Sequence, residues 1–396
     1  MLRPVLNSTL MTRLGIYVQV PFCQTKCTYC NFHTGVFSKD LYAPYVNAVC
    51  REIAEFPRLQ SENRISGVAD AMVDTVYFGG GTPSLLEPAS LSKIVETIRA
   101  SFPSQFEEVT LEADPETITP EKASAWLAAG FNRISMGVQS FDDAELRAAG
   151  RMHRRSDVFN ATKFLRDAGF SNLSFDLIAG LPHQTDRSWR ESVEQLLRLR
   201  PEHVSIYMME IDEGSRLGLE VLQSGERYSA KALPSDDSMA NYYEYGCREL
   251  AAAGYSHYEI SNWGLPGFES RHNLKYWRRE PYFGFGAGAH SFNGSQRWAT
   301  AHDPAAYADA VLHGRFPVEQ FENVTREQAL EEELFLGLRQ LAGVNLGDIE
   351  SRYGAQLRPR LKELLAQGLV EWDGLRLRLS PERLTVSNEV FVHLLE

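Results

Sequence analysis

The sequence predicts an α/β protein: an incomplete (β/α)6 barrel of six strand–helix units, followed by a small C-terminal helical, winged-helix-like domain. Six short β-rich runs are bounded by Gly, Pro, Asn or Asp, as strands usually are. Helical stretches separate these runs, and strands that alternate with helices pair in parallel through βαβ crossovers. Beyond about residue 320 the chain becomes helix-rich instead, which indicates a second, smaller unit.

The elements of the barrel follow in order along the chain. The predicted strands cover residues 15–20, 73–78, 108–113, 133–138, 172–177 and 203–208. One intervening helix should begin at 119–121, where a capping Thr, a Pro at the first helical position and an acid in the first turn coincide, and should end before Gly130. Another helix, at about 156–168, places apolar residues near one face and stops at Gly169.

The C-terminal part predicts helices and a hairpin. The helices are expected at 326–341, 345–353 and 356–367. In the run from Leu369 to Leu379, Asp373-Gly374 separates two alternating segments, which is a strong hairpin signal. The predicted domains are therefore a short N-terminal extension, the barrel and a winged-helix-like domain, at residues 1–14, 15–320 and 321–396.

The composition and charge of the chain exclude some classes of function. The chain of 396 residues has 43% hydrophobic residues, enough for a sizeable core. Its 40 Lys and Arg against 52 Asp and Glu give a net charge of −12, which argues against nucleic acid as the main partner. The first 14 residues contain no continuous apolar segment, and no run approaches the ~18 apolar residues of a membrane-spanning helix. We therefore expect a cytoplasmic protein.

Three cysteines, Cys23, Cys27 and Cys30, lie directly after the first predicted strand. A cubane [4Fe–4S] cluster normally takes four thiolates, so three on one loop leave one iron free to bind a small molecule. A structural zinc site is the alternative, but it needs four ligands, and His33 is the only nearby candidate for the fourth. An odd count of five cysteines makes a disulfide framework the weakest interpretation.

The cysteine loop, with Tyr29 just before its third cysteine, resembles the cluster loop of radical S-adenosylmethionine proteins. More narrowly, the chain resembles the branch that contains oxygen-independent coproporphyrinogen III dehydrogenase and the HemW heme chaperones, from about Gly15 to the C-terminus. The resemblance implies the same incomplete barrel. It also implies that Cys23, Cys27 and Cys30 hold a [4Fe–4S] cluster and that S-adenosylmethionine binds at the open iron.

Polar and glycine residues follow the predicted strands, where barrels of parallel strands build their sites. Carboxylates suit the ammonium group and ribose hydroxyls of S-adenosylmethionine, and Arg suits its carboxylate. By the resemblance, the cofactor-contact positions are Tyr17, Tyr29, Gly80, Gly81, Thr82, Glu112, Gln139, Arg151 and Asp176. Each residue, taken singly, has an alternative role as a strand-end polar group that caps a neighbouring helix.

A third group of residues indicates heme. The run from Arg271 to Trp277 contains His272, and an aromatic and glycine-rich run from Tyr282 to His290 follows. His ligates heme iron, and flat apolar side chains cover the macrocycle. Composition alone favours the alternative of a buried, hydrogen-bonded histidine beside a core Trp. The pattern His-Asn-x-x-Tyr-Trp nevertheless resembles the hallmark of HemW heme chaperones, which implies His272 as the heme ligand, with His290 as the second candidate.

Two functions of different classes remain. The leading one is a HemW-like chaperone that binds heme and delivers it to apo-hemoproteins, including membrane-bound respiratory ones. The resemblance also implies an electron donor as a partner and a homodimer as the assembled form. The rival is a radical enzyme such as the coproporphyrinogen dehydrogenase. Phe32, where that enzyme has another cysteine, and the short N-terminus favour the chaperone branch.

Overall fold

The computed structural model describes residues 11–359 and 361–395, so most of the expected N-terminal extension lies outside the described residues. Six parallel strands form the centre of the fold and are hydrogen-bonded in chain order. They are β1 (Thr12–Val20), β2 (Ala71–Gly80), β3 (Ser104–Ala113), β4 (Arg133–Gln139), β5 (Leu173–Ala179) and β6 (His203–Met208). Each predicted strand is present, and the predicted parallel arrangement is confirmed.

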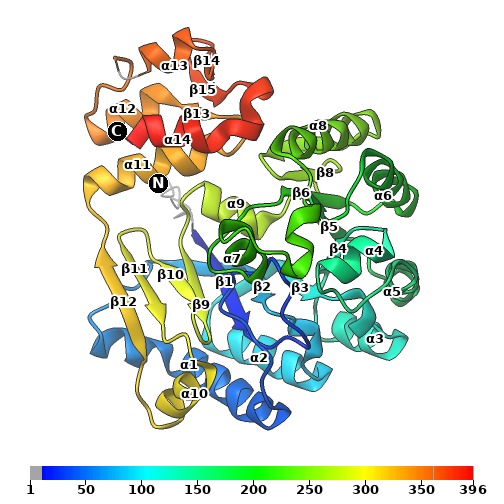
Figure 1. The fold of residues 1–396 in the computed structure, drawn as a ribbon. Coiled ribbons are helices and arrows are strands. Elements are labelled where there is room, and N and C mark those ends of the chain that lie inside the picture. The colour runs from blue at the N-terminus through cyan, green and yellow to red at the C-terminus, as the bar shows by residue number, and fades with distance from the viewer. Residues whose placement is uncertain (1–10, 360, 396) are drawn as a thin grey trace, which may run out of the picture.

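Helices connect these strands, and all of them except α7 cover the outer face of the sheet (Figure 1). They are α1 (Tyr42–Glu62), α2 (Pro88–Ser101), α3 (Pro120–Ala128), α4 (Asp143–Ala148), α5 (Arg155–Ala168), α6 (Asp186–Leu199), α7 (Arg216–Leu222) and α8 (Asp236–Ala252). The predicted boundaries have local causes. The Thr119 side chain accepts a hydrogen bond from the Lys122 N–H at 3.2 Å and caps α3. Helix α5 ends at Gly169, whose φ of 109° suits the left-handed turn that glycine favours.

The sheet continues at both edges beyond the six predicted strands. Beside β6, β8 (Asn262–Gly264) and β7 (Ser256–Glu259) pair antiparallel. Beside β1, β9 (Tyr282–Phe285) pairs parallel, and three antiparallel strands follow it. These are β10 (His290–Phe292), β11 (Gln296–Thr300) and β12 (Val318–Asn323), with α9 (Arg271–Trp277) and α10 (Pro304–Leu312) in the same part of the chain.

The sequence did not indicate these edge strands because most have only three to five residues, too few for an alternating pattern to stand out. The resulting twelve-stranded sheet does not close, because its ends are β12 and β7. The incomplete barrel is thus confirmed, with a wider sheet than predicted. Among the described residues, no helix combines the length and apolar composition needed to cross a bilayer.

The C-terminal part packs above one end of the sheet (Figure 1). It contains α11 (Arg326–Leu338), β13 (Val344–Asn345), α12 (Leu346–Tyr353), α13 (Lys362–Ala366), β14 (Val370–Trp372), β15 (Arg376–Leu379) and α14 (Ser387–Leu395). The predicted hairpin is present, with Trp372 opposite Leu377 and Gly374 in its turn at φ 97°. The helix expected at 356–367 begins later, at Lys362, because Pro359 disfavours helical geometry in the residue before it.

Candidate functional site

A cavity of about 420 Å³ opens beside β1, at the ends of the parallel strands. Residues of the cysteine loop, the first three strands, α9 and the β9–β10 segment form its wall. They are Tyr17, Gln19, Phe32, His33, Gly80, Glu112, Tyr276, Tyr282, Gly288 and His290. The structure thus brings three of the predicted cofactor-contact residues together with both aromatic segments that the sequence associated with heme.

The cysteine loop is held by hydrogen bonds to distant parts of the chain. The Cys23 N–H donates to the Gly35 carbonyl at 2.9 Å, and the Thr28 N–H donates to the Ala149 carbonyl at 3.0 Å. The Thr28 carbonyl in turn accepts from the Leu217 N–H at 2.8 Å, so the first turn of α7 lies against the loop. These contacts fix the backbone between the cysteines, and all three thiols remain partly exposed.

The donor set fits an iron–sulfur cluster. Cys23, Cys27 and Cys30 lie on one loop at the cavity end of β1, and the Arg151 Nη1 donates to the Cys27 sulfur at 3.5 Å. Burial raises the pKa of the Cys23 thiol to about 11. Within residues 11–359 and 361–395, no three Cys, His or carboxylate side chains are placed to hold one metal ion. A cubane cluster does not require that convergence, since each cysteine binds a different iron.

Glu112, at the end of β3, is part of the cavity wall. One carboxylate oxygen accepts a hydrogen bond from the Tyr77 hydroxyl at 2.8 Å, and the other accepts from the Gly80 N–H at 3.1 Å. Burial is the main cause that raises the pKa of Glu112 to about 7, and Asp176 contributes to the rise. A cationic ligand group would favour the ionised form of this carboxylate.

The glycine segment after β2 packs directly on the cysteine loop. The Gly81 N–H donates to the Val20 carbonyl at 2.8 Å, and the Thr82 N–H donates to the Phe22 carbonyl at 2.7 Å. A Cβ at Gly81 would lie 2.6 Å from the Phe22 oxygen and 3.0 Å from the Cys23 sulfur. Only glycine fits at this position, so the glycine segment and the cluster loop form one structural unit.

Arg151, which the resemblance assigns to the ligand carboxylate, makes its strongest contacts within the protein. Its guanidinium forms an ion pair with Asp114 and donates to the Gly137 carbonyl at 2.9 Å. Asp114 also accepts from the Thr82 hydroxyl at 2.9 Å, so it links the glycine segment to Arg151. Asp114 was not among the residues predicted from the sequence, although its position two residues after Glu112, at the end of β3, was a usable signal.

Three other predicted positions, Gln139, Asp176 and Tyr29, are not among the residues that line the cavity. Gln139 ends β4 with φ 62°, in the left-handed region that non-glycine residues rarely adopt and that often marks a functional site. Asp176 accepts a hydrogen bond from the Ser135 hydroxyl at 3.4 Å, and burial raises its pKa. Tyr29 packs against a small apolar cluster that includes Leu217.

His272 belongs to α9, and its side chain is fully buried against β2. Its Nδ1 is hydrogen-bonded to the Thr75 hydroxyl at 2.9 Å, and its Nε2 to the Tyr276 hydroxyl at 2.9 Å. Burial, followed by the charge of Lys275, lowers the pKa of His272 to about 3. Both ring nitrogens therefore have partners in the fold, which is the environment expected of a buried structural histidine. Heme ligation by His272 stays a prediction.

Three other histidines gather at the rim of the cavity. The rings of His33 and His302 lie with their centroids 4.0 Å apart, and His290 is exposed and lines the cavity. Burial and the neighbouring histidines lower the pKa of both His33 and His290. The Nδ1 of His302 is shielded from solvent and has no hydrogen-bond partner in the described part of the chain. From the sequence, His33 was only a candidate fourth ligand of a zinc site and His302 was not predicted, because this grouping depends on the edge strands.

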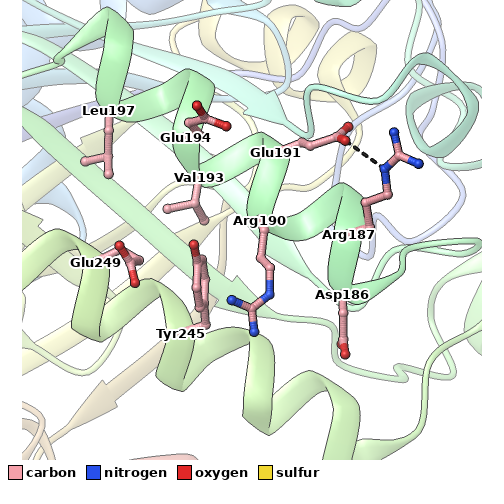
Figure 2. A pocket seen from close by; sticks show the side chains of 9 residues that line it. All are labelled: Asp186, Arg187, Arg190, Glu191, Val193, Glu194, Leu197, Tyr245 and Glu249. Carbon is pink, nitrogen blue, oxygen red and sulfur yellow. Dashed lines mark hydrogen bonds and ion pairs between the residues drawn. The ribbon is translucent and has the colours of Figure 1, made fainter.

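A second hollow, of about 500 Å³, lies on the outer surface between α6 and α8 (Figure 2). Its charged side chains are largely engaged with one another or with aromatic neighbours. Arg187 pairs with Glu191 at 2.9 Å, and the Arg190 guanidinium lies 4.4 Å from the centre of the Tyr245 ring. This hollow contains none of the predicted site residues.

The fold and the three-cysteine loop are those of the Radical SAM superfamily, which residues 17–196 match, and residues 324–382 match the HemN C-terminal domain. The fold of Escherichia coli coproporphyrinogen III oxidase (HemN) is similar, with a TM-score of 0.80 at 21% identity over 97% of this chain and 90% of that one. This likeness confirms the predicted fold.

Similarity over nearly the full length places the chain more narrowly. It is 36% identical to "Heme chaperone HemW" of Bacillus subtilis over 95% of this chain and 97% of that protein. It is 33% identical to the mitochondrial "Radical S-adenosyl methionine domain-containing protein 1" of Bos taurus, over 97% of this chain and 87% of that one. The chain belongs to the HemW family of the Radical SAM superfamily.

Proposed function

We propose that this protein binds heme and delivers it to apo-hemoproteins, and that it carries a [4Fe–4S] cluster with S-adenosylmethionine. The similarity to proteins named heme chaperones over nearly the whole chain carries this proposal. The cavity supports it, because Tyr276, Tyr282, Phe32 and His290 line the same space as Tyr17 and Glu112. Aromatic side chains suit a porphyrin, and imidazole suits its iron.

Cys23, Cys27 and Cys30 would hold the cluster, and Gly80–Thr82 with Glu112 would hold the methionyl part of S-adenosylmethionine. The bound cluster and cofactor together supply the capacity for one-electron chemistry. In this chain, Glu112 offers a carboxylate for the ligand ammonium. Gly81 keeps the backbone close to the cysteine loop, and Arg151 places a cation beside Cys27.

Heme is the cargo in this proposal, and the recipients are apo-hemoproteins, including membrane-bound respiratory ones. The site is open to solvent: Phe32 is 65% exposed at the cavity rim, and His290 is also exposed. An open site suits a carrier that must release its ligand. We also propose an electron donor for the cluster and a homodimer as the assembled form.

The test is a direct comparison of heme binding and porphyrinogen chemistry on anaerobically reconstituted protein. We expect heme to bind with a Kd in the low micromolar range or tighter, about −8 kcal/mol, because delivery requires a site that also releases. We expect no decarboxylation of coproporphyrinogen III by reduced protein with S-adenosylmethionine. Formation of protoporphyrinogen under these conditions would contradict the chaperone function and support the dehydrogenase function.

The cluster assignment has its own control. Replacement of Cys23, Cys27 and Cys30 by Ala should abolish bound iron and the broad absorption near ~400 nm. Replacement of Cys50, which is buried in the core away from the loop, should leave both unchanged. Zinc without iron in the reconstituted protein would contradict the cluster.

A further inference from the structure

The three histidines at the cavity rim come from separate segments of the chain. His33 follows the cysteine loop, His290 begins β10, and His302 lies just after β11. They meet because β9 pairs with β1, which brings the β10–β11 hairpin beside the loop that follows β1. A Cβ at Gly288, in the tight turn before His290, would lie 3.0 Å from the His302 Nδ1. The glycine therefore lets this turn approach the histidines closely.

We propose that His33 and His290 ligate the iron of the bound heme, in place of His272. This inference rests on the proposed heme-carrier function and names the residues that hold the cargo.

The chemistry of heme suits this rim. A porphyrin already supplies four nitrogens to the iron, so the protein needs to add only one or two ligands, and imidazole is a common one. The two imidazoles that line the cavity meet this requirement, although no three-ligand metal site exists in the described residues. Phe32, next to His33, lies 65% exposed on the cavity wall and offers a flat apolar surface for a macrocycle.

His302 supports the same conclusion. Its ring packs against His33, and its Nδ1 is shielded without a hydrogen-bond partner in the described residues. A buried polar atom without a partner is costly, so such atoms tend to mark places where a ligand or ordered water completes the structure. We call His33, His290 and His302 the rim cluster. Within it, the His302 Nδ1 lies beside the turn that precedes His290.

His272 is less suited to the iron. Ligation would require one of its ring nitrogens to leave the Thr75 or Tyr276 hydroxyl, and loss of the first bond would strand the fully buried Thr75 hydroxyl in the interior. A group that loses its only partner while buried incurs its full desolvation cost. His272 is also only 1% exposed, so heme would reach its Nε2 only after the Tyr276 side chain, which lines the cavity, moved aside.

The experiment titrates ferric heme and metal-free protoporphyrin IX into wild type, the double variant His33→Ala/His290→Ala, and His272→Ala. His313→Ala is the matched control, because His313 is an exposed histidine at the end of α10, bonded to the Asp309 carbonyl at 2.8 Å. Iron and sulfide contents of each protein are measured first, so that loss of the cluster is not mistaken for loss of a heme ligand.

We expect the double variant to bind ferric heme about tenfold or more weakly, with a shifted Soret band, and to bind metal-free porphyrin as wild type does. His313→Ala should match wild type in both titrations. The inference is overturned if the double variant keeps the wild-type Soret band and affinity. It is also overturned if heme and metal-free porphyrin weaken equally, or if His272→Ala alone shifts the band. If wild type binds no heme at all, the proposed function itself fails.

Discussion

Glu52, on α1, is a fully buried carboxylic acid. One oxygen accepts hydrogen bonds from the Gly286 N–H at 3.0 Å and from the Tyr307 hydroxyl, and the other has no partner among the described residues. Burial raises the pKa of Glu52 to about 8, so the group is protonated at neutral pH. Its network joins α1 and α10 to the glycine turn that leads to His290.

We predict that the Glu52→Gln variant differs from wild type in its pH dependence of stability. The folded-state pKa of Glu52 lies above its unfolded value, so the folded protein binds the extra proton. The contribution of this proton to the free energy of unfolding of the wild-type protein is therefore fully present below about pH 4.5. It is lost as the pH rises to about 8. Relative to the variant, the wild-type free energy of unfolding should fall by about 1.4 kcal/mol per pH unit in that window. Chemical denaturation at pH 6, 7 and 8 measures this, and parallel curves for the two proteins would contradict it.

At the scale of elements, α9 shows how a family motif serves the fold. His272 bonds to β2 through Thr75, and the buried Lys275 forms an ion pair with Asp74 at 2.8 Å. The Arg339 guanidinium lies over the Trp277 ring, 4.6 Å from the ring centre. The motif thus fastens α9 to the sheet on one side and to the C-terminal part on the other.

The glycine segment after β2 provides the prediction at this scale. Gly81→Ala would place a methyl group 2.6 Å from the Phe22 carbonyl oxygen, which forces the cysteine loop away from β2. We expect the variant to incorporate less than about half of the wild-type iron, because the loop that presents Cys23 is displaced. Iron and sulfide analysis after anaerobic reconstitution measures this. Gly67→Ala is the matched control, since a Cβ there meets nothing within 4 Å. Equal iron content in wild type and Gly81→Ala would contradict the prediction.

At the scale of the whole molecule, the C-terminal part is joined to the sheet by a half-buried ion-pair network. Glu332, on α11, accepts from Arg279 at 2.7 Å and lies 2.9 Å from Arg297 of β11. Backbone hydrogen bonds add to this junction, including the Ile260 N–H to the Arg339 carbonyl at 3.1 Å. The same junction contacts α9, so the C-terminal part supports the wall of the cavity.

Glu332→Ala should loosen this junction. Two arginines would lose a partner that is only 21% exposed, which costs about 1–3 kcal/mol for bonds to charged groups. We expect a lower melting temperature and faster proteolysis in the segment between β12 and α11. Glu331→Ala, at the exposed neighbouring position, should behave as wild type. Identical melting and cleavage of the two variants would show that the ion pairs do not hold the two parts together.

The sequence by itself determined the parts of this protein that depend on neighbouring residues. Alternating apolar runs, helix caps such as Thr119 and stop glycines such as Gly169 act locally, and the six parallel strands followed from them. The cysteine loop was also recognisable, since its three thiols lie within eight residues of one another. These local features were enough to predict the superfamily and the fold.

Only the tertiary structure decided the environment of the histidines. Thr75 and His272 are 197 positions apart, and no local pattern shows that one hydroxyl would meet one ring nitrogen. The rim cluster of His33, His290 and His302 likewise exists because short edge strands extend the sheet beside β1. Whether a histidine is free to bind a ligand depends on burial and on hydrogen-bond partners from elsewhere in the chain, and both are properties of the packed fold.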